Sequence, residues 1–236
     1  PTGSGHPSYG GGMVNSGADA VLVVGAGPRL GAAIARRLAA DGRPLGLIGR
    51  AAPDVARSLG AEGLSAVGAV ADVADADALT AAIDALSQQA GAFDVAVHNV
   101  STWRDAGATT LTQADLLADL AIGTTSLATI ANAVAPGMID RGRGTILATG
   151  SAAADAPTPG APSLSAQKAA LRALVRGFAA ELAPHGVHCA TVTINGLLGT
   201  DGFDEAEIAD VYGDLVRETS APRESWRTVV EFNRRV

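Results

Sequence analysis

Short apolar runs alternate along the chain with longer segments in which apolar residues recur every three or four positions. The runs predict buried strands and the longer segments predict amphipathic helices. The strands are expected at residues 21–24, 45–48, 65–70, 95–99, 144–149, 188–194 and 228–232. Strands that alternate with helices favour right-handed crossovers and a parallel sheet. The pattern therefore predicts an α/β fold with a doubly wound parallel sheet.

The intervening helices have recognisable ends. Thr112 and Asp115 stand three residues apart, as in a capping box, and predict the start of a long helix over residues 112–141. Pro184 and Gly186 end a second long helix over residues 163–183. Further helices are expected just after the first strand and at residues 53–62, 75–90 and 204–218.

The length of 236 residues suits one domain, which we place at residues 18–236. Residues 1–17 are rich in Gly, Ser and Pro without periodicity, and predict a flexible tail or an added expression segment. No apolar run approaches the 18 or more residues of a membrane span. The net charge of −7 argues against nucleic acid and anionic membranes as partners. A single cysteine, Cys189, favours a cytoplasmic location.

The stretch VLVVGAGPRLG, residues 21–31, joins the first strand to a helix through a glycine-rich turn. Glycines allow the backbone to approach a pyrophosphate closely, and a helix N-terminus offers unpaired N–H groups to phosphate oxygens. The turn is therefore a candidate dinucleotide site, formed by Gly25, Gly27, Arg29, Leu30 and Gly31. A plain tight turn is the alternative.

Polar residues also follow the other predicted strands. In an open parallel sheet, ligands bind beyond the carboxyl ends of the strands. The residues at those ends are Arg50, Asp72, Val73, His98, Asn99, Ser151 and Gly196.

These landmarks together resemble the short-chain dehydrogenase/reductase family, from about residue 20 to residue 232. They are the glycine-rich turn, Asp72-Val73, the run 98–101 (His-Asn-Val-Ser), Ser151, Lys168 and Asn195-Gly196. The resemblance implies a Rossmann-type sheet, a nicotinamide dinucleotide cofactor and a small-molecule substrate. It also implies assembly as a homo-oligomer, a dimer or a tetramer.

The sequence departs from the family pattern at three positions. Leu164 stands where the family has a catalytic tyrosine, four residues before Lys168. Ala121 falls where the family has a proton-relaying asparagine, and Arg29 replaces the second motif glycine. Positions 164 and 168 share one face of a helix, where a phenol would be acidified by the ammonium group. Only Ser151 and Lys168 remain of the four catalytic positions that the resemblance implies.

Each surviving group has two interpretations. Lys168 either contacts the cofactor ribose, as the resemblance implies, or is a solvated lysine on the helix surface. Ser151 either touches substrate or bonds the backbone of a polar turn. His98 either replaces the missing acid, since histidine titrates near neutrality, or is a structural histidine, the interpretation we favour.

The end of the second strand bears on the choice of cofactor. An NAD-selective enzyme places an acid there to bind the ribose hydroxyls, whereas this chain has Gly49-Arg50. Arg50 and Arg29 together would clamp the 2′-phosphate of NADP(H), unless both are simply surface arginines. Asp72 would accept from the adenine amino group, as in the family.

Three functions fit these residues. The first is an NADP(H)-dependent oxidoreductase that acts on a carbonyl or imine, because the cofactor supplies the hydride and the loss of a positioned acid only slows the reaction. The second is a dinucleotide-binding regulator without turnover. The third is non-redox chemistry, such as dehydration or cyclisation, in the same pocket.

Overall fold

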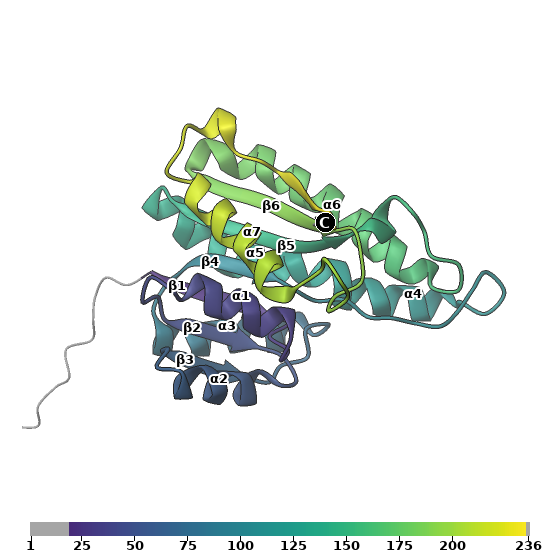
Figure 1. Ribbon diagram of the computed structural model, residues 1–236, viewed down its shortest axis with the longest axis horizontal. Coiled ribbons are helices and arrows are strands. Elements are labelled where there is room, and N and C mark those ends of the chain that lie inside the picture. Colours follow the sequence, from purple (N-terminus) through teal and green to yellow (C-terminus); the bar gives the residue numbers. More distant parts are fainter. Residues whose placement is uncertain (1–18, 235–236) are drawn as a thin grey trace, which may run out of the picture.

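A computed structural model of the chain describes residues 19–234. Its centre is one seven-stranded sheet in the order β3-β2-β1-β4-β5-β6-β7, in which all neighbouring strands are parallel (Figure 1). The strands are β1 (Ala20–Val24), β2 (Leu45–Ile48), β3 (Ala66–Ala69), β4 (Phe93–His98), β5 (Gly144–Ser151), β6 (Val187–Ile194) and β7 (Val229–Phe232). The strand order reverses direction between β1 and β4, where an open parallel sheet forms a crevice. The predicted fold class is confirmed.

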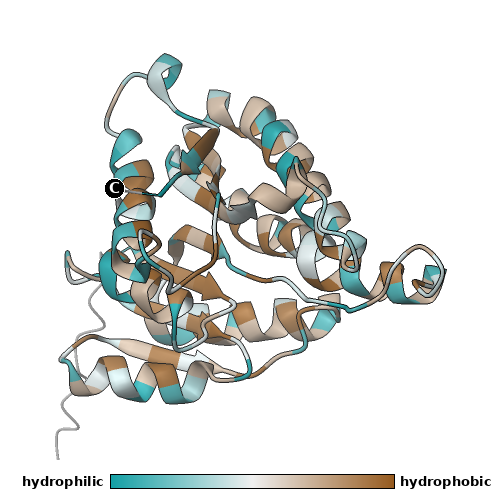
Figure 2. Ribbon diagram, turned by 45° about the vertical axis from the view of Figure 1, so that its right-hand side comes forward, coloured by the Kyte–Doolittle hydropathy of each residue, from teal (hydrophilic) through white to brown (hydrophobic). Residues whose placement is uncertain are grey.

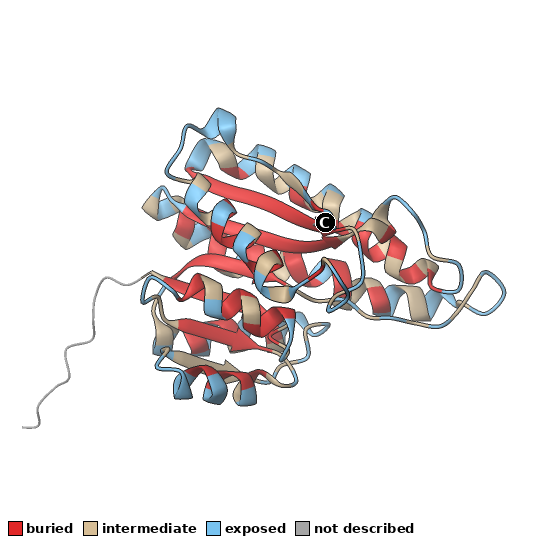
Figure 3. Cartoon of the chain, in the orientation of Figure 1, coloured by how far each residue is buried: buried red, intermediate tan, exposed pale blue. Residues whose placement is uncertain are grey.

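Helices cover both faces of the sheet. One face packs against α1 (Leu30–Leu38), α2 (Ala52–Ala61) and α7 (Glu205–Glu218), and the other against α3 (Ala76–Ala90), α5 (Ser126–Arg141) and α6 (Pro162–Leu182). Apolar residues gather on the strands and on the helix sides that turn toward them (Figure 2). The strands β1, β2, β4 and β6 are buried along their whole length (Figure 3). Two apolar layers therefore sandwich the sheet.

The long helix expected at residues 112–141 is interrupted. It begins as α4 (Gln113–Leu120), widens into one π-helical turn, η1 (Ala121–Thr125), and continues as α5. The capping box is confirmed, because Thr112 accepts from the Asp115 backbone and the Asp115 side chain accepts from Thr112. Each remaining expected element lies within a few residues of its predicted bounds.

By length and composition alone, the helical stretch Gln113–Arg141 is apolar enough to cross a membrane. The expectation from the sequence concerned uninterrupted apolar runs, and polar residues such as Asp119 and Asn132 interrupt this stretch. The core helix of a globular domain passes the same test, and Leu127, Ile130 and Met138 of this stretch are fully buried in the domain core. Packing against the sheet explains its apolar character.

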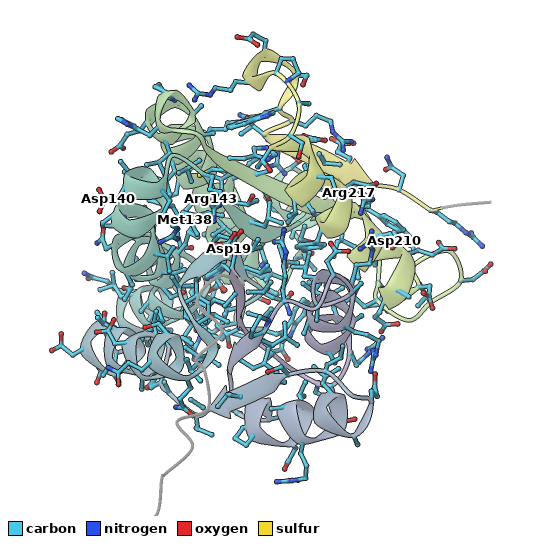
Figure 4. All side chains as sticks on the ribbon, turned by 90° about the vertical axis from the view of Figure 1, so that its left-hand side faces the viewer. Asp19, Met138, Asp140, Arg143, Asp210 and Arg217 are labelled. Atoms are coloured by element: carbon cyan, nitrogen blue, oxygen red, sulfur yellow. The ribbon has the colours of Figure 1, made fainter. Side chains whose placement is uncertain are left out.

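Ion pairs secure the outer elements. Asp19 accepts two hydrogen bonds of 2.7 Å from Arg143, which joins the segment before β1 to the start of β5 (Figure 4). Arg37 on α1 binds Asp210 on α7 at 2.7 Å. The expected tail, residues 1–17, lies outside the described residues.

Candidate dinucleotide site

A cavity of about 670 Å³ opens at the carboxyl ends of β1 to β4. It brings together residues from distant parts of the sequence, as expected for the crevice of a doubly wound sheet. Of the predicted site residues, its walls include Gly25, Gly27, Arg50, Asp72, Val73 and Asn99. Leu30, Gly31, His98, Ser151, Lys168 and Arg29 are not among the lining residues.

The turn after β1 requires glycine at two positions. Gly25 has a φ of 91°, and a Cβ atom there would lie 2.1 Å from the backbone oxygen of Asn99. A Cβ atom on Gly31 would lie 2.6 Å from the backbone oxygen of Gly25. A Cβ atom on Gly27 would meet no protein atom within 4 Å, so the fold does not require glycine there. Gly27 lines the cavity, and its missing side chain leaves that space open. Leu30 is 3% exposed and packs in the core at the start of α1.

A relay of hydrogen bonds holds Asn99 against this turn. The Asn99 amide donates to the Gly25 backbone oxygen at 3.0 Å, and the Thr149 hydroxyl donates to Asn99 Oδ1 at 2.8 Å. Thr149 has only one hydroxyl hydrogen, so the phenol of Tyr212 donates to Thr149 Oγ1 at 2.7 Å. Tyr212 is fully buried on α7, and burial raises the pKa of its phenol. Sequence reasoning did not identify Thr149 or Tyr212, because their partners are far away in the chain.

The two arginines expected to act together are separated. Arg50 lines the cavity beside Asp72, and its guanidinium has no hydrogen-bond partner among residues 19–234. Arg29 instead binds Glu205 at the start of α7, with an Nε–Oε1 distance of 2.8 Å. This geometry places one cation, rather than two, at the corner formed by Arg50 and Asp72.

Lys168 is buried behind the cavity. Its Nζ atom donates to the backbone oxygens of Thr149, at 2.8 Å, and Val100, at 3.2 Å. Burial lowers the pKa of this ammonium to about 8. The contacts exclude the surface-lysine interpretation. Leu164 lies one turn earlier on α6 and is half-buried.

Ser151 ends β5 and forms a local cap. Its hydroxyl accepts from the backbone N–H of Ala153 at 3.2 Å, so it takes part in a polar turn. The side chain is partly exposed. The donor hydrogen of this hydroxyl has no partner within the described chain, and it stays available to a ligand.

His98 is completely buried. Its Nε2 atom lies 2.8 Å from Ser126 Oγ, which itself donates to the Ile122 backbone oxygen at 2.6 Å. The hydrogen therefore resides on Nε2. Burial, followed by the charge of Lys168, lowers the pKa of His98 to about 3. A histidine that is neutral and enclosed at pH 7 favours the structural interpretation.

The loop that follows β4 is fixed by a polar network that sequence reasoning missed. The buried Gln167 amide accepts from the N–H of Thr102 and donates to its C=O, both at 3.1 Å. Arg104 binds the buried Asp119 through two bonds of 2.8 Å, and Asp119 also accepts from Ser163 at 2.6 Å. This network attaches the loop to α4 and α6.

Comparison with known proteins agrees with this arrangement. Residues 19–208 match the family model described as short chain dehydrogenase. The chain is 35% identical over 179 residues to gluconate 5-dehydrogenase of Gluconobacter oxydans (strain 621H), covering 75% of this chain and 68% of that protein. It is 33% identical over 189 residues to the short-chain reductase protein NovJ of Streptomyces niveus, covering 78% and 71%.

A solved structure shows the same architecture. The crystal structure of a metagenomic short-chain oxidoreductase in complex with NADP superposes with a TM-score of 0.82 at 27% identity, covering 92% of this chain and 98% of the other. The two chains therefore share the same overall fold over almost their whole lengths. The chain belongs to the short-chain dehydrogenase family.

Proposed function

We propose that this protein is an NADP(H)-dependent oxidoreductase that acts on a carbonyl or imine of a small molecule. The observation that carries the proposal is Arg50, a cation in the wall of the cavity at the end of β2 that has no partner among the described residues. A guanidinium there matches the 2′-phosphate of NADP(H), whereas a carboxylate would match the ribose hydroxyls of NAD(H). The similar short-chain oxidoreductase that was solved with NADP supports the same cofactor.

The cavity walls fit the other parts of this cofactor. Gly27 lines the cavity, and a Cβ atom there would meet no protein atom within 4 Å, so its missing side chain leaves room for the pyrophosphate to approach the backbone. Asp72 and Val73 would receive the adenine, and Asn99 and Lys168 the nicotinamide ribose. The cofactor supplies the hydride, and the chain positions and polarises the substrate.

The proton requires a different source from the family's tyrosine, since Leu164 occupies that position and Ala121 that of the relay asparagine. Ser151 has a free hydroxyl hydrogen beside the end of β5. Burial lowers the pKa of Lys168 to about 8, which is closer to neutrality than the ordinary value of a lysine. We assign proton delivery to water or the substrate itself, oriented by Ser151. The low pKa of His98 argues against the imidazole as donor.

A second candidate is a protein that binds the dinucleotide without redox turnover. Leu164 and the buried His98 favour it, because neither provides a proton donor at the expected position. Non-redox chemistry in the same pocket, such as dehydration or cyclisation, is a third function that Leu164 and His98 allow. Assembly as a dimer or tetramer and a cytoplasmic location are further parts of the proposal.

The decisive experiment is a titration of the purified protein with NADPH and NADH, followed by NADPH oxidation with a panel of aldehydes, ketones and imines. Tighter binding of NADPH with turnover of at least one substrate supports the oxidoreductase. Tight binding without turnover supports the regulator. Equal affinity for the two cofactors contradicts the role assigned to Arg50.

A further inference from the structure

Gln167 binds the backbone of Thr102 in the manner of a neighbouring strand. Its Oε1 atom accepts from the Thr102 N–H at 3.1 Å, and its Nε2 atom donates to the Thr102 C=O at 3.1 Å. The glutamine is completely buried, and Thr102 is partly buried. A buried amide with both ends satisfied fixes the orientation of the residue that it binds.

Gln167 is itself held in place by the π-helical turn. The Thr124 hydroxyl donates to the Gln167 backbone oxygen at 3.0 Å. A Cβ atom on Gly123 would lie 2.0 Å from Gln167 Oε1, so the side chain fits against a bare stretch of backbone. The π-helical turn thus creates the space that Gln167 occupies, as expected for an irregularity at a functional site.

We call the pairing of the Gln167 amide with the Thr102 backbone the clamp. The residues that it holds form one wall of the cavity. Ser101 and Thr102 both line it, at the end away from Arg50 and Asp72 along the strand order. The hydroxyls of Ser101 and Thr102 have no hydrogen-bond partner in the described part of the chain. Arg104 anchors the loop on the other side of this pair through Asp119.

We propose that Gln167 is a positioning residue that presents the hydroxyls of Ser101 and Thr102 to the reactive end of the bound ligands. Each hydroxyl can donate to a carbonyl oxygen, which the nicotinamide carboxamide and a carbonyl substrate both carry. The inference rests on the proposed cofactor and adds two ligand-contacting residues to it. It also explains how a wall of the pocket stays ordered in a loop.

The test compares two ligands that share the adenosine end. NADPH reaches both ends of the cavity, whereas adenosine 2′,5′-bisphosphate occupies only the end at Arg50 and Asp72. Replacing Gln167→Met keeps the length of the side chain and removes the amide. We expect about tenfold weaker binding of NADPH and unchanged binding of the bisphosphate. Gln89→Met is the matched control, because Gln89 is exposed on α3 and its amide bonds only its own helix, to Ala85 O at 3.1 Å.

Thr102→Val and Ser101→Ala test the hydroxyls without touching the clamp. Each variant retains the backbone groups that Gln167 binds, so we expect a normal fold and about three- to tenfold weaker binding of NADPH. Amide hydrogen exchange gives a readout without ligand. The Thr102 amide should exchange faster in Gln167→Met and at the parent rate in Thr102→Val.

The outcomes distinguish a failure of the proposed function from a failure of the role proposed for Gln167. If the parent binds neither ligand, the proposed function is contradicted and the inference is contradicted with it. If the parent binds both ligands, but Gln167→Met and Thr102→Val each keep the parent's ratio of NADPH affinity to bisphosphate affinity, the inference alone is overturned. Unchanged exchange at Thr102 in Gln167→Met would overturn the clamp itself.

Discussion

The Nζ atom of Lys168 lies 2.8 Å from the backbone oxygen of Thr149, at the point where β5 approaches the end of the sheet. A second carbonyl, that of Val100, accepts from the same ammonium at 3.2 Å. The lysine thus connects α6 with the two strand ends that border the crevice. These two bonds use two of the three donor hydrogens of the ammonium.

The vacant phenol position next to Lys168 leads to the first prediction. Leu164→Tyr places a phenol one helical turn before the ammonium, whose charge lowers the pKa of the phenol. We expect the variant to create or raise NADPH-dependent reduction of a small activated carbonyl. Steady-state NADPH oxidation measures it.

Lys168→Met in the Leu164→Tyr background is the control, and it should remove the gain while it keeps the length of the side chain. A native activity that falls in the single variant, with no new carbonyl reduction, would show that Leu164 belongs to a pocket for another reaction. That result favours the non-redox function.

The second prediction concerns cofactor choice. Arg50→Ala removes a charge-assisted hydrogen bond to the 2′-phosphate, so NADPH affinity should fall roughly ten- to a hundredfold while NADH affinity stays nearly unchanged. Fluorescence titration measures both. Arg57→Ala is the matched control, because Arg57 is an exposed arginine on α2 whose partner within the described chain is Asp54, at 2.8 Å. An equal loss for both cofactors would contradict the assignment.

The third prediction separates the two kinds of glycine in the turn. Gly25→Val and Gly31→Val should abolish dinucleotide binding and also lower stability, because each side chain collides with backbone. Gly27→Val should keep the parent melting temperature and lose binding, since its Cβ meets no protein atom within 4 Å and Gly27 lines the cavity. Calorimetry with and without NADPH distinguishes the cases. Binding retained in all three variants would exclude this turn as the phosphate site.

The fourth prediction concerns Asp94, whose Oδ1 atom is buried without a hydrogen-bond partner in the described chain. Burial raises the pKa of this carboxyl to about 6, although Arg43 lies 3.8 Å away. The folded state therefore holds the proton more tightly than the unfolded chain, whose carboxyl titrates near pH 4. The free energy of unfolding contributed by this group is present below about pH 4 and is lost as the pH rises to about 6.

Asp94→Asn should remove this loss and stabilise the protein at pH 7 by about 1–3 kcal/mol. Urea denaturation of parent and variant at several pH values gives the difference curve. The difference between the two proteins is needed because His98, with its lowered pKa, makes the free energy of unfolding rise with pH over the same range. This contribution is the same in both proteins and cancels in the difference. A difference that does not grow between pH 4 and 6 would contradict the raised pKa.

Local patterns sufficed for the fold because each strand and most helices are specified by nearby residues. The run Val21 to Val24 and the glycines after it predicted β1, the turn and α1. The π-helical turn was not predictable, since the residue that packs against it, Gln167, lies more than forty positions away from Thr124 in the chain. Arg29 was placed beside Arg50 by proximity in the turn, but Glu205, 176 residues further on, binds it instead.

The same distinction holds for the site. Residues that line the cavity through backbone position, such as Asn99 and Asp72, follow directly from strand ends and were identified. The clamp at Thr102 requires a side chain from another helix to reach a backbone amide, and no periodicity encodes such a contact. Burial likewise decided the state of His98, because its exposure depends on Ser126 and the packing of α5 rather than on its neighbours in sequence.

The relay from Tyr212 through Thr149 to Asn99 has a consequence for the order in which the protein matures on the ribosome. The turn at Gly25 leaves the exit tunnel first, yet the last donor that steadies it is on α7, close to the carboxyl end of the chain. A nascent chain therefore completes this relay only after α7 has been synthesised. Fragments released early would have the glycine-rich turn without the support that holds it in shape.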